Sequence, residues 1–325
     1  MLTAPLPPAL DQALRELSVP GGGVQAASDL SRRYRDPERS GGPVARSPED
    51  VLAYAETRLP ATYAAVRIAL GELHARSTLE PVSQLDLGAG PGTALWAAAD
   101  LWPSLVRVTA VEPEPAMVRL GRELAARSAS LPKVEWVGGA LPQAVPAGPF
   151  DLVTLGYVLS ELDGAALADT IDRAWAAASH ALVIVEPGTP AGYRRVLAAR
   201  DRLLAAGGTV VAPCPHDRGC PLAGTDDWCH FAVRLARTSA HRLAKEAQRG
   251  YEDEKFSYVV VAREPAPQAA ARVLRHPQLR RGHVTLELCA PEGLRTETVS
   301  KRDGERYRGA RKISWGEDLR SRGSS

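Results

Sequence analysis

Short apolar runs alternate with amphipathic stretches between about residue 82 and residue 206. The runs are six to eight residues long and rich in Val and Leu, which is typical of buried strands, and the stretches between them have the length of helices. Such an alternation requires crossover connections, which place the strands parallel in one sheet and the helices on both of its faces. The sequence therefore predicts an α/β, doubly wound domain, with strands at 83–88, 106–112, 133–139, 150–157 and 180–187 and helices at 93–102, 116–129, 166–178 and 193–206.

The remaining segments suggest additions to this domain. Residues 1–80 are expected to form a helical N-terminal subdomain, with a helix that starts at Pro48, a break at Pro60 and a loop at the glycines 21–23. The α/β domain is expected to span 81–265, because residues 254–264 are typical of one further strand. An insertion of about 207–250 carries three cysteines and is predicted to end in an amphipathic helix near Arg249. Residues 266–325 are expected to form a basic, β-rich C-terminal extension with two or three strands.

The segment from Asp86 to Thr93, DLGAGPGT, joins the first predicted strand to the first predicted helix. Glycines at this position permit a tight turn and let a ligand approach backbone N–H groups. Glu112 ends the second strand, where a carboxylate can accept hydrogen bonds from ribose hydroxyls. A simple strand-to-helix turn is the alternative interpretation.

This glycine pattern resembles motif one of the class I S-adenosylmethionine-dependent methyltransferases, which have a Rossmann-like fold. The G-x-G-x-x-G pattern of nicotinamide dinucleotide folds is different. The resemblance implies that S-adenosylmethionine is the cofactor, that residues 138–140 lie near its adenine, and that the binding residues are Asp86, Gly88, Gly90, Gly92 and Glu112.

The segment after the fourth predicted strand lacks the usual signs of methyl transfer to an amine. It reads GYVLSEL over 156–162, where enzymes that methylate amines often have an Asn/Asp-Pro-Pro-aromatic sequence. Methylation of pyrimidine carbon generally needs a nucleophilic thiol, and the first cysteine of the chain is Cys214. Tyr157, Ser160 and Glu161 could line a substrate pocket, so the sequence leaves catalysis open and identifies no catalytic residue.

The four cysteines of the chain are unevenly distributed: Cys214, Cys220 and Cys229 lie close together, and Cys289 follows much later. Four thiolates suit Zn²⁺ or an iron–sulfur cluster, because both bind and neutralise soft anions. No C-x-x-C pair occurs, and this favours a cluster over a structural zinc site. His216 and His230 could replace a thiol or donate hydrogen bonds to the site, and four unrelated buried cysteines remain the alternative.

Several longer motifs resemble those of the small-ribosomal-subunit-associated methyltransferase-like family, which includes bacterial proteins and a mitochondrial ribosome assembly factor. They are RLPATYAAV at 58–66, LVIVEPGTPAGY at 182–193, the cysteine segment at 214–231, GHVTLELC at 282–289 and the closing stretch at 302–319. The resemblance implies a [4Fe-4S] cluster on Cys214, Cys220, Cys229 and Cys289. It also implies that the protein binds small-subunit rRNA and assists ribosome assembly or translation. An active S-adenosylmethionine-dependent rRNA methyltransferase is the alternative.

Charge is concentrated at the C-terminus: residues 266–325 contain 13 Lys and Arg and 7 Asp and Glu, whereas the whole chain has a net charge of only +2. A basic segment on a nearly neutral body favours contact with phosphate backbones, although a solvated surface explains it as well. The candidate contacts are Arg280, Arg281, Lys301, Arg302, Arg306, Arg308, Arg311 and Lys312.

The N-terminal sequence lacks the features of a secretion signal, and no apolar run of about 18 residues or more predicts a membrane-spanning helix. A cytoplasmic location without membrane contact is the resulting expectation.

Overall fold

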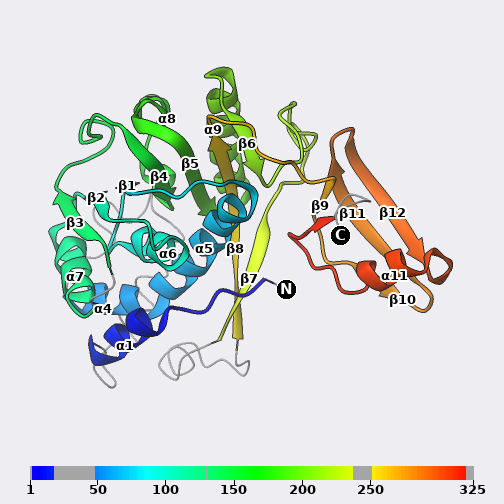
Figure 1. The fold of residues 1–325 in the computed structure, drawn as a ribbon, viewed down its shortest axis with the longest axis horizontal. Coiled ribbons are helices and arrows are strands. Elements are labelled where there is room, and N and C mark those ends of the chain that lie inside the picture. Colours follow the sequence, from blue (N-terminus) through cyan, green and yellow to red (C-terminus); the bar gives the residue numbers. More distant parts are fainter. Residues whose placement is uncertain (1, 18–47, 129–130, 237–250, 320–325) are drawn as a thin grey trace.

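The computed structural model describes residues 2–17, 48–128, 131–236 and 251–319, and its centre is an eight-stranded sheet. The strand order is β3-β2-β1-β4-β5-β8-β6, with β7 paired to the first half of β8 (Figure 1). This order reverses between β1 and β4, which creates the switch point where open α/β sheets bind their ligands. The strands are β1 (Ser83–Leu87), β2 (Arg107–Val111), β3 (Lys133–Val137), β4 (Phe150–Gly156), β5 (Ala178–Pro187), β6 (Thr209–Ala212), β7 (Phe231–Ala236) and β8 (Tyr251–Ala262).

The direction of the strands divides the central sheet into two parts. Strands β1 to β5 are mutually parallel, as the alternation of strands and helices predicts. Strand β8 runs antiparallel to its neighbours β5 and β6, because the chain returns to the sheet after the long insertion and not through a helical crossover. The predicted doubly wound α/β fold is therefore confirmed, with an antiparallel strand near one edge.

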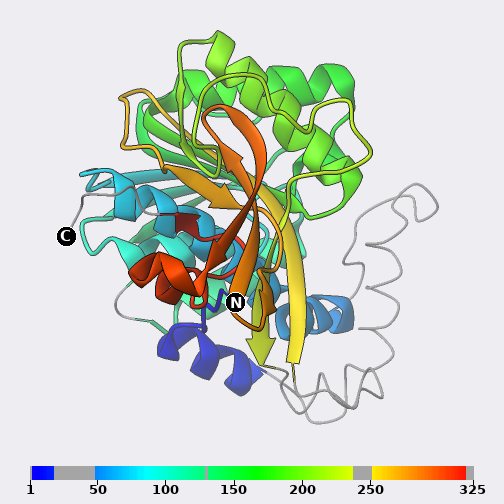
Figure 2. The ribbon, with the colours of Figure 1, turned by 90° about the vertical axis from the view of Figure 1, so that its right-hand side faces the viewer.

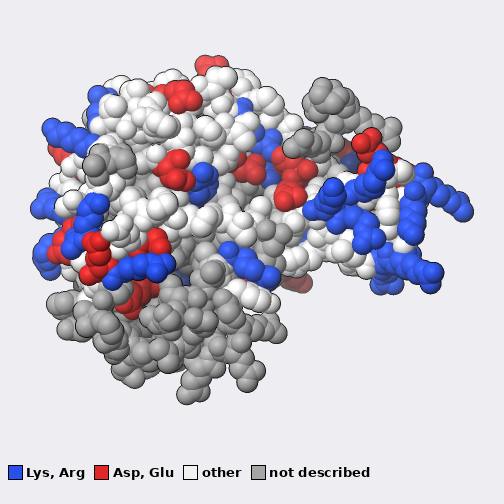
Figure 3. Space-filling view, turned by 60° about the horizontal axis from the view of Figure 1, so that its bottom comes forward, with Lys and Arg blue, Asp and Glu red and all other residues white. Residues whose placement is uncertain are grey.

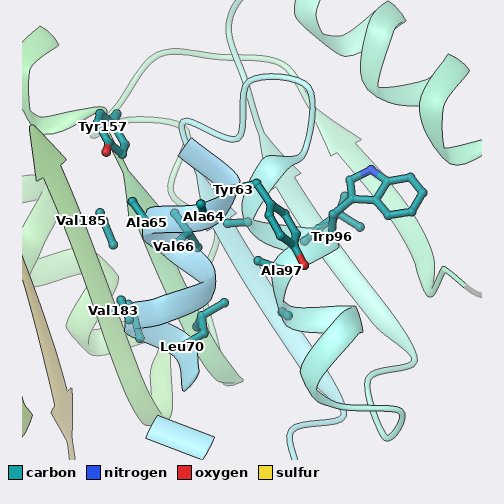
Figure 4. Close-up of a cluster of buried hydrophobic side chains, with 14 of the residues drawn as sticks. Tyr63, Ala64, Ala65, Val66, Leu70, Trp96, Ala97, Tyr157, Val183 and Val185 are labelled. Atoms are coloured by element: carbon teal, nitrogen blue, oxygen red, sulfur yellow. The ribbon is translucent and has the colours of Figure 1, made fainter. Parts of the chain in front are cut away.

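Helices cover both faces of this sheet. One apolar cluster joins the sheet to α1, α4, α5, α6 and α7, and a second joins the opposite face to α8 and α9. Figure 4 shows side chains of α5, such as Tyr63 and Leu70, between α6 and Val183 of β5. The helices are α1 (Pro8–Leu17), α4 (Pro48–Thr57), α5 (Leu59–Arg76), α6 (Thr93–Leu101), α7 (Pro115–Ala125), α8 (Gly164–Ala177) and α9 (Pro190–Ala205).

A second sheet of five antiparallel strands is formed by residues 271–319, which we call the C-terminal lobe. Figure 1 shows the lobe at the side of the α/β body, and Figure 2 shows it from the front. It has a small apolar core of its own. Its elements are β9 (Ala271–Val273), β10 (Gln278–Arg280), β11 (His283–Ala290), β12 (Gly293–Ser300), the 3-10 helix η2 (Lys301–Asp303), α11 (Glu305–Ala310) and β13 (Asp318–Leu319).

Most of the predicted elements agree with the structure, and two do not. The helix expected before Arg249 is wrong at its start, because Phe231–Ala236 is strand β7, held by pairing with the early part of β8. Residues 237–250 and the glycines 21–23 lie outside the described residues. The described part of the extension has five strands and not two or three. The sequence does not reveal β9, β10 and β13 because each has only two or three residues, too few for a sequence pattern. Helices α4 and α5 separate near Pro60, as predicted.

No helix among the described residues is long and apolar enough to cross a membrane.

A buried ion-pair network joins the C-terminal lobe to helix α5. Arg272 of β9 is 2% exposed, and its two terminal nitrogens donate to the two carboxylate oxygens of Glu72 at 3.0 and 2.9 Å. The same guanidinium lies 3.0 Å from Asp318 of β13, and Arg76 pairs with both Glu72 and Asp318. The planar guanidinium can satisfy several acceptors at once, which suits it to such a buried position.

Replacement of Arg272 should therefore destabilise the protein more than replacement of an exposed arginine. Arg272→Met leaves Glu72 and Asp318 without their buried partner, and the loss of one partner from a buried pair costs about 3–5 kcal/mol. We expect urea denaturation to show a fall of about 3 kcal/mol in the free energy of unfolding. The control is Arg295→Met, which removes surface ion pairs with Glu292 and Glu297 and should cost less than about 1 kcal/mol. Equal effects of the two substitutions would contradict the role of Arg272.

Candidate functional site

The glycine loop between β1 and α6 has a backbone that requires glycine. Gly88, Gly90 and Gly92 have φ values of 69, 55 and 84°, in the left-handed region that side chains disfavour. A Cβ on Gly88 would lie 2.4 Å from Val158, and one on Gly92 would lie 2.6 Å from Leu95. The loop therefore packs tightly against the turn after β4 and brings its backbone to the carboxyl end of β1, at the switch point of the sheet.

Glu112 holds this loop in place from the end of β2. Its two carboxylate oxygens accept hydrogen bonds from the backbone N–H groups of Gly90 at 2.8 Å and Glu114 at 2.9 Å. Burial raises the pKa of Glu112, while these two hydrogen bonds lower it. Carboxylate oxygens can each accept more than one hydrogen bond, so Glu112 still has acceptor capacity for a ligand.

Asp86 is 1% exposed and lies on β1 beneath the loop. It accepts a hydrogen bond from the Thr154 hydroxyl at 2.8 Å, and its other carboxylate oxygen has no hydrogen-bond partner among the described residues. Burial, with a smaller contribution from the charge of Glu112, raises the pKa of Asp86 to about 7. Asp86 thus contributes to the β1–β4 junction below the loop.

The turn after β4 is fixed by contacts with β8 and β5. Tyr157 is the one described residue other than glycine with a left-handed φ, 62°, and its hydroxyl donates to Glu254 of β8 at 3.0 Å. Glu186, at the end of β5, accepts the backbone N–H of Leu159 at 2.9 Å. Of the three proposed pocket residues, Tyr157 is buried, Ser160 half-buried and Glu161 exposed by its accessible surface. Desolvation and the charge of Glu112 nevertheless raise the pKa of Glu161 to about 7, so its carboxyl also lies near the loop.

The structure brings the four predicted cysteines together. Cys214, Cys220, Cys229 and Cys289 line one cavity of about 40 Å³, which has room for more than one water molecule. Three of them come from the insertion after β6 and the fourth from β11 of the C-terminal lobe. Burial raises the pKa values of Cys214, Cys229 and Cys289, and repulsion from neighbouring thiolates contributes to each increase; together they bring the pKa of Cys289 to about 12.

Several residues around the cavity were not predicted as part of the site. The hydroxyl of Tyr193 lies 3.2 Å from the sulfur of Cys220. Arg200 of α9 is 3% exposed, lines the cavity, and donates to the carbonyl oxygens of His216 at 3.1 Å and Arg218 at 2.6 Å. An arginine on the apolar face of a predicted helix is the sequence signal that could have identified Arg200.

The two histidines of the cysteine segment differ in their contacts. His216 Nε2 lies 3.7 Å from the sulfur of Cys289. The ring of His230 stacks on Trp228 and meets Trp315 of the C-terminal lobe edge-on, both at 5.0 Å between ring centroids. Burial lowers the pKa of both histidines, which favours neutral rings. His216 is therefore adjacent to a thiol, whereas His230 packs between the cysteine segment and the lobe.

The four cysteines around the cavity are the kind of ligand that a soft metal centre uses. Their side chains are not placed close enough together to hold a single metal ion. Zn–S distances of ≈2.3 Å would hold four sulfurs within roughly 3.8 Å of one another. No group of three or more His, Cys, Asp or Glu side chains in the described part of the chain is arranged to hold a metal ion. Cys214, Cys220 and Cys229 are half-buried and Cys289 is buried, and their thiolates are the soft donors that a metal centre would use.

The predicted phosphate contacts gather at one end of the C-terminal lobe. Strand pairing places Arg280 opposite His283, and His283 opposite Ser300. Lys301 then donates its backbone N–H to Gly282 at 2.9 Å, which joins the β10–β11 turn to η2. We call this surface the basic end, and Figure 3 shows the cations on the lobe. It comprises Arg280, Arg281, Lys301, Arg302, Arg306, Arg308, Arg311 and Lys312, all exposed.

Most cations of the basic end are available to a partner. Arg306 pairs with Glu297, and Arg311 lies over the ring of Tyr307. Within the described residues, the seven basic side chains other than Arg306 form no ion pair with a carboxylate. Charges without internal partners produce an outward positive potential.

Comparison with solved structures finds S-adenosylmethionine-dependent methyltransferases. One from Aquifex aeolicus is 16% identical and has a TM-score of 0.41, covering 67% of this chain and all of its own. Precorrin-6y C5,15-methyltransferase from Geobacter metallireducens is 18% identical with a TM-score of 0.40, covering 61% of this chain and 87% of its own. The strand order and the helices on both faces identify the central domain as a Rossmann-like, class I methyltransferase fold.

Comparison with curated proteins finds mitochondrial relatives. The human "Ribosome assembly protein METTL17, mitochondrial" is 34% identical over 289 residues, covering 82% of this chain and 62% of the human protein. The "Rsm22-cox11 tandem protein 2, mitochondrial" of Schizosaccharomyces pombe is 26% identical, covering 82% of this chain and 42% of the yeast protein. The chain therefore spans less than two thirds of the length of either relative.

The family assignment rests on a match to nearly the whole described chain. Residues 48–320 match the family model named Rsm22, described as mitochondrial small ribosomal subunit Rsm22. This range contains the glycine loop, all four cysteines and the basic end. The chain belongs to the Rsm22 family.

Proposed function

We propose that this protein binds the rRNA of the small ribosomal subunit through the basic end and assists assembly or translation. The observation that carries this proposal is the gathering of eight exposed cations, from three segments, at one end of the C-terminal lobe. Lys and Arg that neutralise phosphates release condensed counterions, which favours RNA binding and makes it dependent on salt. The family membership and the human relative named as a ribosome assembly protein support the small subunit as the partner.

Removal of charge from the basic end should weaken RNA binding and reduce its salt dependence. In the variant, Arg280, Arg281, Lys301 and Arg302 are all replaced by Gln. We expect at least about a tenfold weaker affinity for small-subunit rRNA near physiological salt, and a log–log salt slope smaller by roughly 3. Fluorescence anisotropy over a salt series measures both quantities.

A control variant tests whether the position of the removed charges matters or only their number. Arg107, Arg119, Arg122 and Lys133 are exposed cations of β2, α7 and β3, and their replacement by Gln changes the charge by the same amount. This control should leave the salt slope nearly unchanged. Equal losses in the two variants would contradict a specific role for the basic end.

We propose that the glycine loop binds S-adenosylmethionine, with Glu112 facing the ribose and residues 138–140 near the adenine. The left-handed glycines and the carboxylate that holds Gly90 support this proposal. When bound, the cofactor would supply an activated methyl group. The residues of this chain would position it: the loop backbone approaches the ligand, and the turn after β4 closes the adjacent side through the contact of Val158 with Gly88.

Substitution of one glycine should test this site, with a matched glycine as control. Gly92→Ala places a Cβ 2.6 Å from Leu95 at a φ of 84°, so the loop must shift. We expect calorimetry to show at least a tenfold loss of S-adenosylmethionine affinity. Gly207→Ala has the same φ of 84° with nothing within 4 Å, and should retain the affinity of the unaltered protein. Unchanged binding in Gly92→Ala would exclude the loop as the site.

We propose further that Cys214, Cys220, Cys229 and Cys289 hold a [4Fe-4S] cluster, with zinc as the alternative metal. The four thiols around one cavity support this proposal, because a bound cation offsets the mutual repulsion that helps to raise the pKa values of Cys214, Cys229 and Cys289. The cluster would act here as a cross-link between the cysteine segment and β11. Strand β11 carries Cys289 near one end and His283, beside the basic end, at the other, about 20 Å apart.

Cys289→Ser should therefore lose iron and weaken RNA binding while the helices remain folded. Anaerobic purification with iron, sulfide and zinc analysis measures the metal, and circular dichroism measures the helical signal. Tyr193→Phe keeps all four thiols and should retain the iron. RNA affinity that is the same in the iron-free protein would contradict the coupling, and an iron-free unaltered protein would exclude the cluster.

Methyl transfer to rRNA is a second candidate function, favoured by the glycine loop. Transfer of a labelled methyl group to immature small subunits would demonstrate it. Retention of assembly activity by Gly92→Ala would instead favour a role that does not require the cofactor.

A further inference from the structure

The C-terminal lobe has a charged surface without exposed Phe, Trp or Tyr. Residues 266–325 contain only two such side chains, Tyr307 and Trp315. They are 7% and 8% exposed, and the indole nitrogen of Trp315 donates to the carbonyl of His230 at 3.0 Å. The large apolar side chains exposed on the described lobe are Leu279 and Leu294, which are aliphatic. The lobe therefore offers cations without an exposed Phe, Trp or Tyr ring on which a base could stack, and its exposed histidine, His276, packs edge-on against Trp315 at 4.9 Å between ring centroids.

This combination distinguishes two ways of binding RNA. Proteins that bind single strands generally combine a positive groove with aromatic side chains on which successive bases stack. A double helix already stacks its own bases, and proteins recognise it largely by shape and by contacts to phosphates and 2′-hydroxyls. Exposed cations without an exposed Phe, Trp or Tyr ring match the second way.

The backbone also holds the cations in fixed positions. Asp303 accepts hydrogen bonds from the backbone N–H of Ser300 at 2.7 Å and from its hydroxyl at 3.0 Å, and these bonds fix the 3-10 helix that carries Lys301 and Arg302. The hydrogen bond from Lys301 to Gly282 fixes this helix beside Arg281. Cations on an ordered sheet end suit the regular phosphate spacing of a duplex.

We propose that the basic end docks on the phosphate backbone of a double-helical RNA element and not on the bases of a single strand. This inference rests on the RNA-binding function proposed above and specifies the form of RNA. Because phosphates carry no sequence information, binding at this surface is largely independent of sequence.

Binding of duplex and single-stranded RNA by the full chain tests the inference. The probes are a 20-base-pair RNA duplex of arbitrary sequence and each of its strands alone, chosen to lack self-complementarity, at the same salt concentration. We expect the duplex to bind at least tenfold more tightly than either strand, and a duplex of another sequence to bind within about threefold of the first. Single strands that bind as tightly as the duplex would overturn this inference alone. Failure of all the probes to bind would overturn the RNA-binding function and this inference with it.

Two variants locate the effect. Arg280→Gln with Arg281→Gln should reduce the duplex affinity and lower the salt slope by roughly 2. Leu279→Trp adds an exposed aromatic ring beside these arginines and should raise single-strand affinity severalfold without a matching gain for the duplex. Duplex binding that is insensitive to the arginine substitutions would overturn the assignment to the basic end.

Discussion

One buried guanidinium connects the parts of this molecule that carry its candidate sites. Arg272 of β9 binds Glu72 of α5, and it also donates to the carbonyl oxygens of Pro213 at 3.0 Å and Gly316 at 2.7 Å. Pro213 precedes the first cysteine, and Gly316 precedes β13. The attraction between Arg272 and the carboxylates, together with these hydrogen bonds, offsets the cost of burying the charge. The position of the C-terminal lobe relative to the α/β body depends on this residue.

The cysteine cavity lies at the same junction. Its walls come from α9, the cysteine segment, β8, β9 and β11, so it exists only when the lobe is docked. The positive charges of Arg200 and Arg272 favour thiolates in this cavity, against the effect of burial. Strand β11 then extends from the cavity to the basic end. A structural change at the thiols can therefore be transmitted to the basic end through one strand. The glycine loop lies elsewhere on the central sheet and is held by other residues, such as Glu112.

The sequence predicted the elements whose patterns are long and local. The parallel strands and their helices, the break near Pro60 and the glycine loop follow from hydrophobic periodicity and from glycine and proline chemistry. Strand β7 was predicted as part of a helix, because its pairing with β8 depends on residues about twenty positions away and leaves no local pattern. The short strands β9, β10 and β13 escaped detection because two or three residues are too few for a sequence pattern. Arg200 and Arg272 were missed as site residues because burial of a charge is decided by tertiary contacts.

The sequence by itself determined the α/β class, the candidate cofactor residues, the set of four cysteines and the excess of positive charge near the C-terminus. These properties depend on residue type and on neighbours along the chain. Only the tertiary structure decided that Cys289 joins the other three cysteines around one cavity, that Glu112 holds the loop through Gly90, and that the basic residues share one end of the lobe. Convergence of this kind results from strand register and from the buried ion pairs, which act between segments far apart in the sequence.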